Sequence, residues 1–537
     1  MICNYLTPIH ILKAFYNYDN RIFSCISDYR QNIDLTKYSY SDLQYFLQLF
    51  VEGYFRPTTL TVSNNRLPTQ IQIFTATCDL PLRFRSTDVH HLSLIECTND
   101  NIQAIKSCVQ KFKSLQSLRI VESASNENNP LLHYDIIEKL RNFMLDQFVK
   151  LELSINQGII LDNRLHPNKY LKQLIISLQK FNDLFVLFDG LVPNLVVLNV
   201  TICQSDTCKR LEIPKHWPRE FMLHLVEFRL KTNENVTMNL NYFRSIVMPL
   251  SQLQNLTIDV RKWFSHDQQF VRGNHIEMLI NEFMPRLCHF HCFIQTMHDI
   301  NMQSFTMLNK RWLMACRSTS DNLQKHLYTI PWPFEQLHLS MLADDDTESI
   351  CPNVQHLIVD VGCINLSRRF PNVHTLIVLP QSNLTRDDFV GFRHLRHLTA
   401  DNIEMASSPL TRHIHTLTLS KTFHLLNNLI IYPNVRHLIL TNDEIDSLVI
   451  ITALVQYFPN LYSIKIQLKP NTEYYDCLNL LLDGQHLPNL ILLKTNWFDQ
   501  YTYCSNIQLW IAANTPLEWK LTPFYGHCGR KYLTICL

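Results

Sequence analysis

The side chains best suited to chemistry lie in the stretch CHFHC, which contains Cys288, His289, His291 and Cys292. Thiolates and imidazoles are the ligands that zinc prefers, so this stretch raises the question of a metal site. It also alternates as a β-strand does, and successive strand residues point to opposite faces. Both cysteines would then face the core and both histidines the solvent, so the four ligands could not converge. We therefore assign no metal here.

Other polar groups in the chain have simpler explanations than catalysis. The acidic run 344–346 could hold a cation, but such a run is typical of a solvated loop. The pairs His394/His397 and His413/His415 have neither an adjacent nucleophile nor a metal-ligand spacing. We therefore assign no catalytic residue to these groups.

The low glycine content argues against nucleotide-binding enzymes. The chain has 9 glycines in 537 residues, and the one close pair is Gly526 and Gly529. Phosphate-binding loops need clustered glycines so that the backbone can approach the ligand. The patterns GxGxxG, GxxxxGK, GxSxG and HExxH are all absent. The sequence therefore predicts a protein that is not an enzyme and that has no cofactor.

Composition constrains the partners and the compartment. The 48 basic and 47 acidic residues nearly cancel, so nothing global favours nucleic acid or an anionic membrane. No apolar run reaches the roughly 18 residues that a membrane-spanning helix needs, and the N-terminus lacks the features of a signal peptide. The 16 cysteines form no CxxC pair, as expected for reduced core thiols. We expect an intracellular protein of the cytoplasm or nucleus.

A nine-residue sequence recurs along the chain. PNVQHLIVD at 352–360 returns as PNVHTLIVL at 371–379 and PNVRHLILT at 433–441. Its apolar residues follow the pattern apolar-x-x-apolar-x-apolar, here called the repeat motif. Further copies of the motif are Val89/Leu92/Leu94, Leu115/Leu118/Ile120, Phe148/Leu151/Leu153, Leu171/Leu174/Ile176, Leu195/Leu198/Val200, Leu225/Phe228/Leu230, Leu253/Leu256/Ile258, Leu287/Phe290/Cys292, Phe334/Leu337/Leu339, Leu395/Leu398/Ala400, Ile414/Leu417/Leu419, Leu461/Ile464/Ile466 and Leu490/Leu493/Thr495, with a weaker copy at Pro57/Leu60/Val62.

Each repeat motif predicts a short strand. Its last two apolar residues, one residue apart, have strand periodicity and should point into the core. Many motifs follow Pro-Asn, where proline ends the preceding element and asparagine favours the turn into the strand. The longest interval, from Phe290 to Leu337, is expected to contain an insertion.

Helical periodicity fills some of the intervals between motifs. The segment 98–112 has Thr98 as a candidate cap and places Ile102, Ile105, Val109 and Phe112 on one face. The segment 443–458 similarly aligns Leu448, Ile451, Leu454, Val455 and Phe458. A strand and a helix that repeat cannot bury their own apolar faces, so neighbouring repeats must stack.

The repeat resembles the leucine-rich repeat, L-x-x-L-x-L-x-x-N/C-x-L, over roughly residues 55–500. The L-x-x-L-x-L half is well kept. Cys97, Asn156, Cys203 and Asn233 match the N/C position, but most copies have other residues there. The resemblance implies an α/β solenoid over 31–537, with a C-terminal cap from about residue 500. A parallel sheet would line its concave face, with helices on the convex side.

The concave face is the expected binding surface for a target protein. Its residues flank the inward-pointing apolar pairs and are polar, mixed in charge and rich in histidine. The candidates we single out are Arg229, His338, His356, Asp360, His397, Asp401 and His437. Because an imidazole with an ordinary pKa gains its charge near pH 6.5, we expect partner affinity on this face to change between about pH 5.5 and pH 7.5.

The N-terminal stretch 7–30 resembles the second half of an F-box. It has an apolar pair, Ile11-Leu12, followed by Lys13-Ala14-Phe15, Asn17 and Arg21-Ile22-Phe23. With NRLPTQIQIF and VRGNHIEMLINEFMP further on, the order resembles a divergent F-box/leucine-rich-repeat family of small invertebrates.

Members of that family are regarded as substrate receptors of cullin–RING ubiquitin ligases. The resemblance implies that Ile11, Leu12, Phe15, Ile22 and Phe23 contact the linker subunit of the ligase. The resemblance starts partway through the F-box, so we expect residues 1–30 to be a partial F-box that binds the linker weakly or not at all. We expect residues 7–30 to form one or two helices packed near Leu60 and Val62. The alternative is a repeat scaffold without a link to a ligase.

Overall fold

The structure is a computed structural model. It describes residues 11, 13, 31–52, 57–65, 67, 69–79, 88–98, 101, 104–105, 108–123, 148–161, 167–205, 222–264, 274–297, 311–318, 324–341, 350–360, 365–382, 384, 391–401, 413–420, 431–469, 473–496, 507–517, 524–528 and 532–537. The predictions for Leu12, Phe15, Ile22, Phe23, Ile102 and the acidic run 344–346 lie outside these residues.

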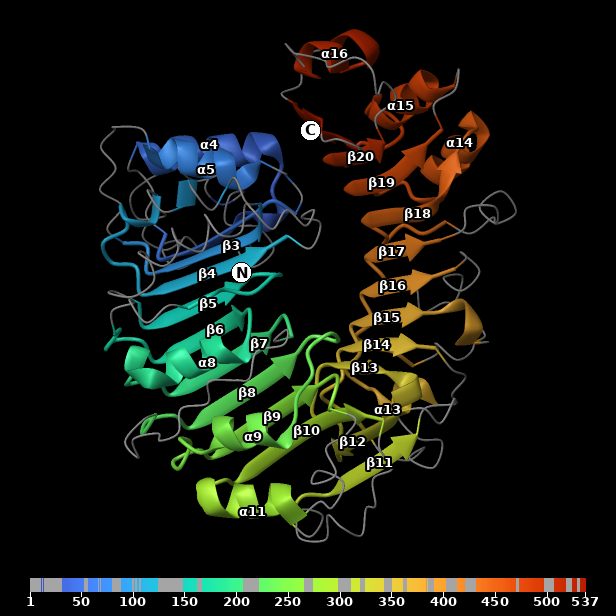
Figure 1. Cartoon of the computed structure of the whole chain (residues 1–537). Coiled ribbons are helices and arrows are strands. Elements are labelled where there is room, and N and C mark those ends of the chain that lie inside the picture. The colour runs from blue at the N-terminus through green and yellow to red at the C-terminus, as the bar shows by residue number, and fades with distance from the viewer. Residues whose placement is uncertain are drawn as a thin grey trace. The chain divides into compact units, whose positions relative to one another are not determined.

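The described chain is a mixed α/β protein with two large, mostly parallel sheets (Figure 1). It divides into two compact units, Met1–Tyr38 with Asp42–Ile330, and Ser39–Ser41 with Pro331–Leu537. The sequence predicted one continuous array over 31–537, whereas each unit has a sheet of its own.

The sheet of the first unit has the order β1-β2-β3-β4-β5-β6-β7-β8-β9-β10-β12-β11. Its strands are β1 (Asn32–Asp34), β2 (Thr59–Ser63), β3 (His91–Cys97), β4 (Ser117–Glu122), β5 (Lys150–Ser154), β6 (Gln173–Leu178), β7 (Val197–Ile202), β8 (Glu227–Thr232), β9 (Asn255–Val260), β10 (His289–Thr296), β11 (Met314–Ser318) and β12 (Lys325–Thr329). Strands β1 to β10 pair in parallel, and β12 then pairs antiparallel with both β10 and β11.

The sheet of the second unit has the order β13-β14-β15-β16-β17-β18-β19-β20-β22-β21. Its strands are β13 (Gln336–His338), β14 (His356–Val359), β15 (Thr375–Val378), β16 (His397–Ala400), β17 (Thr416–Leu419), β18 (His437–Ile445), β19 (Ser463–Leu468), β20 (Leu492–Asn496), β21 (Tyr525–Cys528) and β22 (Tyr532–Cys536). Strands β13 to β20 are parallel, and β22 pairs antiparallel with β20 and β21.

Helices connect some of the parallel strands, since a parallel pair needs a crossover. The first unit contains α4 (Tyr40–Val51), α5 (Gln70–Asp79), α8 (Phe181–Val186), α9 (Leu240–Val247) and α11 (Asn274–Phe283), with short turns at η2 (Leu35–Lys37) and η3 (Leu187–Leu191). The second contains α13 (Leu366–Arg369), α14 (Leu448–Tyr457), α15 (Tyr474–Leu482) and α16 (Ile507–Asn514), with 3-10 turns η5 (Leu339–Met341) and η7 (Pro380–Ser382). None of the helices in the described residues has the length and apolar character that crossing a bilayer requires.

Every repeat motif coincides with a strand, and its apolar residues form the core. In the motif that forms β14, for example, Val354, which precedes the strand, and Leu357 and Val359, which lie in it, are each 0% exposed. Phe334 is the exception, because its side chain is only half-buried. The sequence did not predict β1, β11, β12, β21 and β22, which lack the motif. Strands β11 and β12 lie in the interval between Phe290 and Leu337 where an insertion was expected.

The predicted helices form with local corrections. Helix α14 begins after Ser447, whose Oγ accepts a hydrogen bond from the N–H of Val449 at 3.2 Å. Its residues Ile451, Leu454 and Val455 are buried, but Leu448, predicted on the same face, is half-buried. The predicted helical segment 443–458 also began too early, because β18 extends to Ile445. In the other segment Ile105, Val109 and Phe112 are buried as predicted.

A recurring backbone contact sets the register between motifs. In most repeats, the carbonyl of the residue before the strand accepts hydrogen bonds from two consecutive N–H groups of the next motif. The carbonyl of Gln355, for example, accepts from His374 and Thr375 at 2.9 and 3.0 Å. The same double acceptor recurs at Thr58, His90, Gln116, Val149, Lys172, Val196, Val226, Gln254, Glu335, His374, Arg396, His415, Arg436 and Tyr462. Equivalent side chains of successive motifs therefore lie side by side.

The asparagine of the Pro-Asn pairs has a role that the sequence did not predict. The Nδ2 of Asn372 donates to the carbonyl of Pro352 at 2.9 Å, and that of Asn460 donates to Pro433 at 3.0 Å. Asn194 makes the same bond to Lys169 at 3.0 Å. These asparagines connect neighbouring repeats, in addition to any preference for the turn.

Candidate functional site

The parallel register arranges the exposed side chains of the second sheet in rows. The row called here the histidine row runs across the strands from β13 to β20, and a parallel row lies two residues further along each strand. The histidine row is Gln336, His356, Thr375, His397, Thr416, His437, Ser463 and Leu492. The second row is His338, Ile358, Ile377, Thr399, Thr418, Ile439, Lys465 and Lys494.

Three of the four predicted histidines share a row. His356 and His397 are exposed and His437 is half-buried, with Nδ1 of His437 2.8 Å from the Oγ of Ser463. The three alternate with threonines, so consecutive histidines are two strands, or about 9–10 Å, apart. His338 lies in the second row and does not join them.

The predicted carboxylates Asp360 and Asp401 have partners within the chain. Each directly follows a strand, Asp360 after β14 and Asp401 after β16. Asp360 accepts a hydrogen bond from the N–H of Ser340 at 2.9 Å and another from its hydroxyl at 2.5 Å. The hydroxyl of Ser420 donates to Asp401. Both aspartates thus connect neighbouring repeats, which reduces what they can offer to a partner.

Arg229, the candidate in the first sheet, is also paired. Its side chain is exposed, and its Nε lies 2.7 Å from Oε1 of Glu227. Arg119 and Glu152, on neighbouring strands of the same sheet, form a second pair at 2.9 Å. The exposed cations of these two pairs therefore have carboxylates beside them.

The CHFHC stretch differs from its prediction at one position. Cys292 is buried and both histidines are exposed, as alternation predicts. Cys288, however, is exposed, because it precedes β10 and the alternation does not extend to it. Its Sγ contacts the carbonyl of Arg286 at 3.3 Å. Among the described residues no three His, Cys, Asp or Glu side chains are grouped so that they could hold a metal ion.

Sequence reasoning missed the residues that immediately precede the strands. We call Gln355, His374, Arg396, His415, Arg436 and Tyr462 the edge row, since their carbonyls form the recurring double acceptor. Within it, the guanidinium of Arg436 lies 5.0 Å from the ring centroid of Tyr462. The signal was present in dipeptides such as Arg396-His397 and Arg436-His437, which recur at one motif position.

Side chains of the edge row and of the histidine row lie close enough to change one another's pKa values. Burial lowers the pKa of His397, and His356, His415 and His374 lower it further. Burial likewise lowers the pKa of His415, helped by Arg396 and Arg436. Each imidazole thus resists protonation chiefly because burial disfavours its charged form, and also because positive or protonatable groups surround it.

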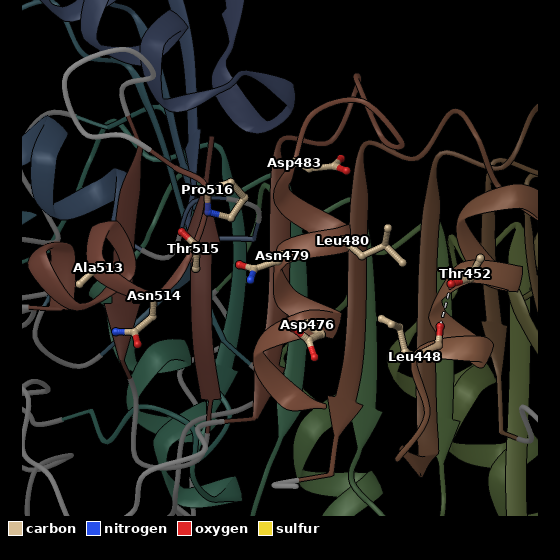
Figure 2. Close-up of a pocket in the computed structure, with 10 residues that line it drawn as sticks. All are labelled: Leu448, Thr452, Asp476, Asn479, Leu480, Asp483, Ala513, Asn514, Thr515 and Pro516. Carbon is tan, nitrogen blue, oxygen red and sulfur yellow. Dashed lines mark hydrogen bonds between the residues drawn. The ribbon is translucent and has the colours of Figure 1, made fainter. Parts of the chain in front are cut away.

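A groove with a volume of about 720 Å³ lies in the C-terminal part of the second unit. Residues of helices α14, α15 and α16 line it (Figure 2). Leu448 and Thr452 come from α14, and Asp476, Asn479 and Leu480 from α15. The remaining lining residues are Asp483, Ala513, Asn514, Thr515 and Pro516. Asp483 is held by the N–H groups of Gln485 and His486, and its Oδ2 lies 2.5 Å from the imidazole Nδ1 of His486. No candidate residue from the sequence lies in this groove.

Two residues of the predicted linker-binding segment are described. Ile11 is 0% exposed. The amine of Lys13 forms an ion pair with Asp42 and lies 5.6 Å from the ring centroid of Tyr45, both on α4. The described contacts of Lys13 are thus with α4, and the packing of residues 7–30 near Leu60 and Val62 stays a prediction.

Neither a protein-family model nor a curated protein matches this chain.

Proposed function

We propose that the chain is a leucine-rich-repeat solenoid without enzymatic activity, which binds a partner protein through the exposed face of its parallel sheets. The supporting observation is that every repeat motif forms a strand, with its apolar residues other than Phe334 buried and the residues between them largely facing outward. Different positions of the motif then determine the fold and the choice of partner. The inward residues form the core, while the outward residues can differ from protein to protein according to the partner.

The resemblance of residues 7–30 to an F-box leads to a further part of the proposal. The protein is a substrate receptor of a cullin–RING ubiquitin ligase inside the cell, in the cytoplasm or nucleus. Ile11, Leu12, Phe15, Ile22 and Phe23 would contact the linker subunit, and the sheet face would hold the protein to be ubiquitinated.

One observation favours a second candidate, a repeat scaffold with no link to a ligase. Ile11, the first residue of the proposed linker-binding set, is fully buried, and Lys13 is held by Asp42 on α4. A segment that packs on its own chain caps the repeats and offers less apolar surface to another protein.

Binding of the purified linker subunit by the full chain separates the two candidates. The receptor predicts a complex in titration calorimetry that Phe15→Ala combined with Phe23→Ala weakens at least about tenfold, as expected for aromatic anchors. Val449→Ala removes an apolar side chain that is 65% exposed on α14 and serves as the matched control. Absence of binding by the full chain would reject the receptor and leave the scaffold.

A further inference from the structure

One part of the second sheet collects positive charge. Within strands β16 to β19 and directly before them, the exposed or half-buried side chains include Arg396, His397, His415, Arg436, His437 and Lys465, here called the basic face. From β14 to β20 the edge row, the histidine row and the second row contain no aspartate or glutamate. The carboxylates Asp360 and Asp401 lie beyond the rows and are bound by serines.

The described contacts of these cations do not neutralise them. Arg396 donates to the carbonyl of His413 at 3.3 Å, and Arg436 to that of Asn460 at 3.1 Å. The ring of Tyr462 lies beneath Arg436, and the Nζ of Lys465 is 5.9 Å from the ring centroid of Tyr532. Carbonyls and ring faces orient a cation without cancelling its net charge. Among the described residues Arg396, Arg436 and Lys465 have no ion-paired carboxylate.

The first sheet shows the contrast within the same protein. There Glu152 lies beside Arg119, and Glu227 beside Arg229, at ion-pair distances. Both sheets come from the same motif, so this charge separation is a property of the outward residues and not of the fold. The overall balance of 48 basic and 47 acidic residues conceals it.

We propose that the basic face binds an extended, acidic segment of the partner protein. The inference rests on the proposed partner-binding function and specifies the chemistry of what is bound. Complementary charge would steer the segment to the sheet and align it across the strands.

The distance between strands determines how far apart the acidic residues of such a segment should be. Arg396 and Arg436 occupy the same position two strands apart, which corresponds to about 9–10 Å. A segment in the polyproline II conformation rises about 3.1 Å per residue and completes a turn in three residues, so every third side chain lies on one face at about this spacing. Carboxylates about three residues apart would therefore face the two guanidinium groups.

Single-stranded RNA, the other polyanion to consider, fits less well. Proteins that bind it without sequence preference offer open aromatic rings on which bases stack. On this surface Arg436 lies over the ring of Tyr462, and Lys465 and Lys494 approach the ring of Tyr532. These rings are therefore already in contact with cations of the protein, which leaves them less open to stacking with bases.

The test uses the full chain and fluorescent peptides in an anisotropy titration. One peptide has glutamate at every third position among serine and valine, and its control has glutamine in place of each glutamate. We expect the glutamate peptide to bind at least about tenfold more tightly, and less tightly as salt is raised. Arg396→Gln combined with Arg436→Gln should reduce its affinity about tenfold or more. The matched control is Arg368→Gln with Lys469→Gln, which removes two exposed cations of the same unit that lie outside the rows.

Three results would overturn the inference. These are equal affinity for the two peptides, equal loss in the two double variants, or a single-stranded RNA that binds more tightly than the glutamate peptide and depends on Arg396 and Arg436. Thermal unfolding of each variant shows whether it is folded. If the linker subunit binds the full chain but the glutamate peptide does not, this inference fails while the proposed receptor function stands.

Discussion

The guanidinium of Arg436 lies over the ring of Tyr462, and the two residues occupy the same position in successive repeats. The backbone brings them together, because the carbonyl of Arg436 accepts the N–H groups of Tyr462 and Ser463 at 2.7 and 3.0 Å. A second contact, from Arg436 to the carbonyl of Asn460, holds the other side of the guanidinium. Arg436 is thus oriented before a partner arrives, which reduces the entropy lost on binding.

Removing the ring tests this orientation without changing charge. Tyr462→Ala should weaken binding of the glutamate peptide about two- to fivefold, as expected for losing a cation–π contact of about 0.5–1 kcal/mol. Anisotropy titration measures the effect. Tyr170→Ala, which removes a tyrosine that is 66% exposed in the first unit, should leave the affinity unchanged. Unchanged affinity in both variants would mean that Tyr462 does not orient the guanidinium of Arg436 for binding.

The inward positions of the motif should tolerate no charge. Leu376 is 0% exposed on β15, so Leu376→Asp places a carboxylate in the core without a partner. We expect a loss of several kcal/mol in the free energy of unfolding, or failure to fold. Urea denaturation monitored by circular dichroism measures it. Thr375→Asp, at the neighbouring outward position, should cost far less, and similar losses in the two variants would contradict the assigned faces.

The asparagines after proline should contribute through their bonds to the preceding repeat. Asn372→Ala removes the bond to the carbonyl of Pro352 and should lower the free energy of unfolding by about 1 kcal/mol. Asn353, at the same position of the preceding motif, is exposed, and among the described residues it makes no such bond to an earlier repeat. Asn353→Ala should therefore change stability less, and an equal loss would assign the effect to the turn itself.

Buried His326 should make the protein less stable in acid. The side chain lies on β12, 5% exposed, with its ring centroid 5.4 Å from that of Phe293. Burial lowers its pKa to about 4, and Arg261 contributes. Because the unfolded chain takes up this proton near pH 6.5, the stabilisation is complete above that pH and lost as the pH falls toward 4.

At pH 5 the loss amounts to about 2 kcal/mol. Urea denaturation between pH 7 and pH 5 measures it, and His326→Gln should flatten the pH dependence. His224→Gln, at an exposed histidine, supplies the control. A pH dependence that persists in His326→Gln would exclude His326 as its source.

The histidines of the basic face predict the opposite pH effect on binding. The pKa values of His397 and His415 are lowered, so both imidazoles are neutral near pH 7 and gain charge as the pH falls. A bound carboxylate favours the charged form, so affinity for the glutamate peptide should rise from about pH 7.5 to pH 5.5. The charged and titratable groups around them are His356, His374, Arg396, His413 and Arg436.

His356→Ala combined with His397→Ala should flatten this pH profile and leave most of the affinity at pH 7.5, where the arginines act. Anisotropy titrations at several pH values measure both quantities. If the affinity of the unaltered protein does not change with pH, these histidines are exposed to solvent but take no part in binding the peptide.

The strands that contain the motif were predictable because burial acts on side-chain type. Leu357 and Val359 are apolar, so their removal from water is favourable. Because they are two residues apart in a strand, both point to the same side of the sheet. Their outward neighbours, such as His356 and His397, were predictable for the same reason. Strands β11, β12, β21 and β22 were not, because they pair antiparallel at the ends of the sheets and do not repeat the motif.

What the sequence alone determined, then, is which residues are inward and which are outward, since this depends only on periodicity and apolarity. Tertiary structure decided which outward residues meet, because register between distant repeats is set by backbone bonds such as those to the carbonyls of Gln355 and Arg436. It separated His338 from the histidine row, and it gave Asp360 and Asp401 serine partners from neighbouring repeats. It also brought Arg396, His415 and Arg436 together, although no short stretch of sequence contains them, because a sheet joins residues that are one repeat apart in the chain.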